Sequence, residues 1–184
     1  MNVDLFQNAV LDAPFMLKEA VISDCTFYRY ELRRIWDTGK PMLVVCMLNP
    51  STADSSINDP TVLTLIHFGK LWGYGGLLIV NLYAFRSSSP AEMFSKGADA
   101  IGPMNEKYTF AAVKYAKENG GKLLAAWGNG GHEKAMFFAE RVNCAGVELI
   151  CLGNTQSGAP KHPLARGKHR IPRDQMPIVW RAAA

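Results

Sequence analysis

Short apolar runs alternate with helical patterns along most of the chain. Mainly apolar runs lie at residues 42–48, 77–82, 122–127 and 147–152. Runs of this length are typical of strands that are buried on both faces of a sheet. Apolar residues at helical spacing predict helices over residues 60–72, 105–118 and 132–143. Asp59 followed by Pro60 is typical of a helix start, with Asp59 as the N-cap.

Strands that alternate with helices predict an α/β fold, because parallel strands need crossover helices between them. We expect a three-layer sandwich around a mainly parallel central sheet of about four strands. Residues 26–36 alternate aromatic or aliphatic with charged side chains, which predicts an N-terminal edge strand or hairpin with one solvated face. The whole chain, residues 1–184, is expected to form a single domain. Residues 1–40 would be its N-terminal edge segment, and residues 155–184 a basic, mostly irregular C-terminal segment.

The composition is that of an ordinary globular domain. Of 184 residues, 48% are hydrophobic and 20% are charged, which provides enough apolar material for a core and argues against disorder. The net charge of +4 permits a polyanionic partner without requiring one. The sequence shows no secretion signal and no run long enough to span a bilayer, so we expect a cytoplasmic protein without a membrane partner. The four cysteines form no C-x-x-C pair, which argues against a zinc ribbon.

Ligands of parallel α/β sheets bind at the carboxyl ends of the strands, so the loops after the four apolar runs are the candidate sites. The first loop carries Asn49, Pro50 and Ser51, and it is either an ordinary Asn-Pro turn or a functional loop. In the second, Asn81 interrupts an apolar strand. A buried amide must find partners, so Asn81 is either satisfied by a neighbouring loop or exposed at the rim of a pocket.

Three further loop features widen the candidate list. Gly128 and Asn129 begin a glycine-rich turn whose backbone N–H groups could bind an anion, although the turn matches no phosphate-loop motif. His162 stands between prolines and cationic residues, where an imidazole can donate a proton or stabilise an oxyanion. Five cationic side chains could bind phosphates or form a solvated tail, and these are Lys161, Arg166, Lys168, Arg170 and Arg173.

These motifs resemble two families. Residues 48–54, Asp59-Pro60-Thr61, residues 81–84 and residues 161–164 closely resemble an uncharacterised bacterial and phage family, domain of unknown function 1643, over about residues 25–170. More distantly, Asn49-Pro50, Asn81 and His162-Pro163 resemble the short motifs of the uracil-DNA glycosylase superfamily, in the same order along the chain. This second resemblance implies a uracil-DNA-glycosylase-like fold.

The glycosylase resemblance also implies roles for the site residues. Asn49 would position the attacking water, Asn81 would read the amide edge of a base, and His162 would stabilise the negative charge of the leaving base. Asn cannot accept a proton, so Asp54 or Asp59 would have to assist. The residues expected to bind the substrate lie on the loops after the four apolar runs. They are Pro50, Ser51, Asn81, Tyr83, Arg86, Gly128, Asn129, Lys161 and Arg166. The cysteines do not have the iron–sulfur spacing of some relatives, and we expect no cofactor.

Three functions remain open from the sequence. The first is action on a nucleobase, nucleotide or nucleic acid, with hydrolysis of an N-glycosidic bond as the reaction. The second is a nucleic-acid-binding module without catalysis, which would use the basic stretch after Lys161. The third is processing of small nucleotides, with Lys161 and the glycine-rich turn at residues 128–131 holding a phosphate.

Overall fold

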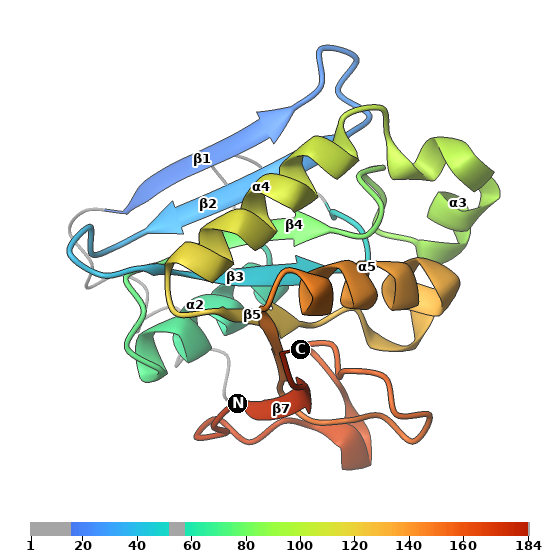
Figure 1. Ribbon diagram of the computed structural model, residues 1–184. Helices are drawn as coiled ribbons and strands as arrows, with labels where there is room; N and C mark the ends of the chain where they lie inside the picture. The colour runs from blue at the N-terminus through green and yellow to red at the C-terminus, as the bar shows by residue number, and fades with distance from the viewer. Residues whose placement is uncertain (1–15, 52–57, 184) are drawn as a thin grey trace, which may run out of the picture.

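The computed structural model describes residues 16–51 and 58–183 of the chain. In this part of the chain, seven strands form one sheet in the order β1-β2-β4-β3-β5-β6-β7 (Figure 1). The strands are β1 (Leu17–Ile22), β2 (Arg29–Ile35), β3 (Met42–Met47), β4 (Gly76–Asn81), β5 (Lys122–Ala125), β6 (Glu148–Cys151) and β7 (Ile178–Arg181). The α-helices in the same residues are α2 (Pro60–Leu71), α3 (Pro90–Ser95), α4 (Asn105–Glu118) and α5 (His132–Cys144).

The sheet is mixed, and it is larger than the sequence predicts. The pairings β4·β3, β3·β5 and β5·β6 are parallel, whereas β1·β2, β2·β4 and β6·β7 are antiparallel. The expectation of a mainly parallel sheet of about four strands is therefore wrong in the number of strands and in the share of parallel pairings. The four apolar runs form the interior of the sheet, and strands with weaker apolar patterns extend it on both sides.

Two hydrophobic cores lie on opposite faces of the sheet. Alternate residues of the interior strands, such as Val44 and Leu78, pack with α4 and α5, whereas their neighbours Val45 and Leu77 pack with α2. In Figure 1, α4 and α5 cover the face of the sheet that is turned toward the viewer. The expected three layers are present, because strands that are buried on both faces need helices on both sides.

The expected N-terminal hairpin is present, since β1 and β2 pair antiparallel at one end of the sheet, but residues 26–36 are not its edge strand. The strand within this range, β2, pairs with both β1 and β4, so β1 is the outer strand. Its charged positions are largely buried: Arg34 is 0% exposed and Glu31 is 6% exposed. The solvated face that the alternation predicts is absent from β2, because α4 and the segment before α2 pack against it.

The C-terminal segment is mostly irregular in its described residues, as expected, but it contains one strand that was not predicted. Residues 155–184 include β7, which pairs with β6 and closes the second edge of the sheet. Trp180 of β7 packs edge-on against Trp127, at 5.3 Å between ring centroids, and its indole N–H donates to the carbonyl of Gly158. This strand was not predicted, because it directly follows Pro177 in a segment that is rich in Pro, Arg and Lys.

The local signals for helices were more reliable. Asp59 is the N-cap of α2 and Pro60 is its first residue, as the sequence predicts. The short helix α3 was not predicted, since residues 86–90 read as a polar loop; Ser89 is its N-cap and Pro90 its first residue. None of the helices in the described part of the chain has the length and apolar content needed to cross a membrane.

Candidate functional site

Parallel pairing brings the first two candidate loops together at the carboxyl edge of the sheet. Met47 at the end of β3 is in register with Asn81 at the end of β4. Beyond the strands, the backbone N–H of Tyr83 donates to the carbonyl of Leu48 at 2.9 Å. The segments that follow β3 and β4 therefore leave the sheet side by side. Their polar residues lie at the same carboxyl edge of the sheet.

Asn49 is held in one orientation by its amide nitrogen. Its Nδ2 donates to the carbonyl of Ser87 at 2.8 Å and to that of Pro50 at 3.1 Å. Ser87 in turn donates its backbone N–H to the carbonyl of buried Pro50. The Oδ1 of Asn49 accepts no hydrogen bond from the described residues, so the side chain presents a fixed acceptor. Ser87 was not a candidate in the sequence, where it read as one of three loop serines.

Asp59 links the first loop to the start of α2. One carboxylate oxygen accepts the backbone N–H of Val62 at 2.8 Å, and the other accepts the hydroxyl of Ser51. The preceding residue, Asn58, accepts a 2.6 Å hydrogen bond from Nε of the fully buried Arg34. The guanidinium of β2 thus helps to set the position from which α2 begins.

His162 belongs to the loop after β6 and lies beside the segment that follows β5. The backbone N–H of Gly128 donates to the carbonyl of Pro160 at 3.0 Å, and a Cβ added to Gly128 would lie 3.7 Å from Cβ of His162. The neighbouring Lys161 is tied to the end of β6 by a backbone hydrogen bond to the carbonyl of Gly153. The loop that carries His162 is therefore docked onto two adjacent strand ends.

The environment of His162 favours a neutral imidazole. Burial lowers the pKa of His162, and the negative charge of Asp59 opposes this effect in part. The backbone N–H of Leu164 donates to Nδ1 at 3.1 Å. Because Nδ1 is the acceptor, the proton of the neutral ring is on Nε2. His162 is thus set to donate a hydrogen bond from Nε2 at neutral pH.

Asn81 is buried and lacks hydrogen-bond partners for its side chain. It is 1% exposed, and neither Nδ2 nor Oδ1 has a hydrogen-bond partner in the described part of the chain. By strand alternation with Leu77 and Ile79, its side chain lies on the α2 side of the sheet. An unpaired buried donor or acceptor costs about 1–3 kcal/mol, so an amide in this state suits a ligand that would pair with it.

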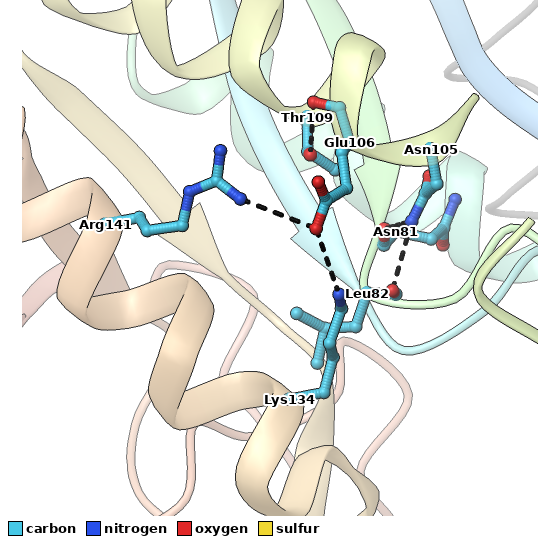
Figure 2. A network of polar contacts seen from close by, with 7 residues as sticks. All are labelled: Asn81, Leu82, Asn105, Glu106, Thr109, Lys134 and Arg141. Carbon is cyan, nitrogen blue, oxygen red and sulfur yellow. Dashed lines mark hydrogen bonds and ion pairs between the residues drawn. The ribbon is translucent and has the colours of Figure 1, made fainter. Parts of the chain in front are cut away.

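The backbone around Asn81 is held by Asn105, at the start of α4. Figure 2 shows that Nδ2 of Asn105 reaches the carbonyls of Asn81 and Leu82, at 3.0 and 3.1 Å. Next to it, Glu106 forms ion pairs with Lys134 and Arg141 of α5. These contacts brace α4 against α5 and the end of β4. Neither Asn105 nor Glu106 stood out in the sequence, where both read as ordinary first-turn helix residues.

Several predicted site residues point elsewhere. Tyr83 packs with the α4/α5 core and lies edge-on to Phe94, on the opposite side from Asn81. Arg86 donates to the carbonyl of Thr26 in the turn before β2. Asn129 accepts the hydroxyl of Ser157. The contact of Tyr83 joins its loop to α3, whereas those of Arg86 and Asn129 join loops to one another. Asp54 lies outside the described residues.

A cavity of about 660 Å³ lies beside His162, between α2 and residues 163–173. Arg166 is one of its lining residues. His67 of α2 and Arg173 also line it, and the sequence did not indicate that these two lie together. Nε2 of His67 is 2.7 Å from the carbonyl of Arg173, so this contact links α2 to the segment on the other side of the cavity. The described residues contain no cluster of His, Cys, Asp and Glu that could hold a metal ion.

The structure thus gathers Asn49, Ser51, Asp59 and His162 at one edge of the sheet, with buried Asn81 on the adjoining strand. The family model for a protein of unknown function, DUF1643, matches residues 29–164, and the chain belongs to this family. No curated protein and no solved structure gives a significant match to the chain.

Substitution of Asp59 should separate its charge from its capping role. Asp59→Asn keeps an acceptor for the N–H of Val62 but removes the charge that raises the pKa of His162, so this pKa should fall further. Asp59→Ala should also destabilise the protein by about 1 kcal/mol through loss of the N-cap. The imidazole can be titrated by NMR and the stability measured by urea unfolding. An unchanged pKa of His162 in Asp59→Asn would contradict the electrostatic contact.

The stability of the protein should depend on the protonation of His162. Its pKa is lowered in the folded state, so on acidification below about 6.5 the unfolded chain binds a proton before the folded chain does. The free energy of unfolding should therefore fall with decreasing pH more steeply in the wild type than in His162→Gln. Urea unfolding across this range measures the difference, with His169→Gln as the matched control. Parallel pH profiles for the wild type and His162→Gln would rule out the burial effect.

Proposed function

We propose that the chain binds a nucleobase of a nucleotide or nucleic acid at this edge of the sheet and hydrolyses its N-glycosidic bond. The observation that carries the proposal is the neutral imidazole of His162, held with its Nε2–H free to donate. A base that leaves a sugar takes the electron pair of the broken bond and becomes an anion. A fixed donor in a partly desolvated site stabilises that anion without reorganisation.

The attacking water would be held by Asn49. Two backbone carbonyls occupy its Nδ2, so its Oδ1 is left as an acceptor of fixed direction. In the reaction, the water oxygen forms a bond to the sugar carbon while the bond from that carbon to the base nitrogen breaks. The carboxylate of Asp59 would stabilise the positive charge that develops on the sugar. The attacking water loses one proton and the departing base anion takes it up, so the products are a sugar hydroxyl and a neutral base.

Asn81 would recognise the base. Its unpaired amide has one acceptor and two donors on the α2 side of the sheet, and Asp59 caps the helix on that side. Because Asn81 is 1% exposed, neighbouring side chains must move for a base to reach it. An amide edge of a nucleobase has the complementary donor and acceptor, which is why such a site discriminates strongly against ligands that lack them. The short motifs at Asn49-Pro50, Asn81 and His162-Pro163, which resemble those of the uracil-DNA glycosylase superfamily, support the same assignment and a related fold.

A non-catalytic nucleic-acid-binding module is the second candidate, and one observation favours it. Both oxygens of Asp59 already accept hydrogen bonds, from Ser51 and Val62, so this carboxylate is not an unoccupied general base. In that case the same residues would bind a base without cleaving it. The two candidates differ in whether the bond to the sugar is broken.

Base excision can be measured directly on single- and double-stranded oligonucleotides that contain uracil, hypoxanthine or mismatches. The wild type should produce abasic sites, detected by alkaline strand cleavage. Loss of the oxyanion donor in His162→Ala should slow the reaction by roughly 100–1,000-fold. His169→Ala, which changes a nearby histidine of the same segment, should leave the rate unchanged. If the wild type yields no abasic sites, hydrolysis is wrong, and binding without cleavage remains to be tested on the same strands.

Replacement of Asn81 should improve stability while it removes recognition. In Asn81→Leu, an unpaired buried amide is exchanged for an apolar group of similar size, so the free energy of unfolding should rise by about 1 kcal/mol. The affinity for oligonucleotides with the preferred base should fall. Urea unfolding and fluorescence anisotropy measure the two effects. A variant that is destabilised yet retains base preference would show that the amide has a structural role.

A further inference from the structure

The cavity between α2 and residues 163–173 is built for a ligand that is partly apolar and partly anionic. Its volume of about 660 Å³ is in the usual range for small-molecule sites. Leu63 and Phe68 of α2 line one side, and Pro163 and Ile171 line the other. Phe68 and Ile171 also belong to the α2 core, which makes the floor of the cavity rigid and apolar.

The rim of the cavity is cationic. Arg166 and Arg170 line it and are exposed, and neither forms an ion pair or side-chain hydrogen bond within the part of the chain that is described. Among the described residues, no Asp or Glu lines the cavity. Residues 161–173 contain five Lys and Arg and no acidic residue, although the whole chain has a net charge of only +4. Positive charge is therefore concentrated where the cavity opens.

The cavity adjoins the proposed site through two pairs of consecutive residues. Pro163 lines the cavity and follows His162, and Pro60 lines it and follows Asp59. A ligand that extends from the His162 site thus reaches the cavity without crossing the sheet. The apolar floor suits an unstacked base, because bases stack on apolar and guanidinium surfaces. The arginines of the rim suit the adjoining phosphates, because phosphates pair with Arg.

We propose that this cavity binds the nucleotide next to the base at His162, with its base against Leu63 and Phe68 and its phosphate between Arg166 and Arg170. The inference rests on the proposed function and makes its substrate class specific. The substrate is a single-stranded polynucleotide, because a base seated in the cavity is unstacked from its neighbours. A free mononucleotide fills only the His162 site.

The test compares the binding of three ligands to the full chain by fluorescence anisotropy or calorimetry. These are a single-stranded oligonucleotide of about ten nucleotides, the same strand with abasic residues beside the central base, and a free nucleoside monophosphate. The abasic strand keeps its phosphates, so the expected weakening of roughly tenfold reports the missing base in the cavity. Equal affinity for the intact and abasic strands, or for the strand and the mononucleotide, would overturn the proposal.

Charge variants test the rim. Arg166→Gln combined with Arg170→Gln should weaken binding of the intact strand roughly 25-fold in about 0.1 M salt and reduce the slope of log affinity against log salt by about 1.4. The control combines Lys114→Gln with Lys117→Gln, which removes two charges from α4 on the opposite face of the sheet, and it should change neither quantity appreciably. Equal effects of the two double variants would overturn the proposal.

Occupancy of the two sites can be followed separately. The NMR signal of the His162 imidazole reports the proposed base site, and the mononucleotide should shift it in the wild type and in the Arg166/Arg170 double variant alike. If that shift occurs while the abasic and arginine tests fail, the cavity proposal is wrong and the base site stands. If no nucleotide shifts the imidazole, the proposed function itself is wrong.

Discussion

The carboxylate of Asp59 is the interaction on which the candidate site depends. It caps α2 and accepts a hydrogen bond from the hydroxyl of Ser51, which lies in the loop after β3. Its negative charge also raises the pKa of His162, which lies in the loop after β6. Two segments that are close in the sequence and a third that is distant thus share one charged group. The carboxylate stabilises the start of the helix at Pro60, and Arg34 from β2 binds the residue before it. A change at Asp59 therefore affects the helix, the loop and the imidazole together.

The antiparallel strands at the two ends of the sheet have different consequences for the site. β2 brings the buried guanidinium of Arg34 to the start of α2. β7 holds the segment around Gly158 through Trp180, and this segment leads into the loop of His162. The parallel strands lead into the polar loops at the carboxyl edge of the sheet. The antiparallel strands β2 and β7 hold these loops in place. This division explains why a site made from irregular segments has defined geometry.

The elements that could be predicted were those with dense local signals. The interior strands are continuous apolar runs, and α2 and α4 have clear boundaries, so their residues were identified within one or two positions. β1, β7 and α3 were not identified, because β1 contains Lys18 and Glu19, β7 follows a segment rich in Pro, and α3 has only six residues after a polar loop. β7 is a strand only because β6 presents an open edge to it. Such pairings depend on partners that are far away in the sequence, and a local pattern does not contain them.

The same distinction applies to the site. The chemical identities of Asn49, Asp59 and His162, and their location after strands or at a helix start, follow from the residues themselves, since strand ends and N-caps have local signatures. The orientation of each side chain does not. Tyr83 and Arg86 stand in loops beside Asn81 in sequence, yet packing against Phe94 and the turn at Thr26 directs them away from it. The tautomer of His162 follows from a local turn, in which the N–H of Leu164 donates to Nδ1. The burial of the imidazole, the unpaired amide of Asn81 and the cavity beside α2 arise from contacts between distant segments, because these exist only after the chain has folded.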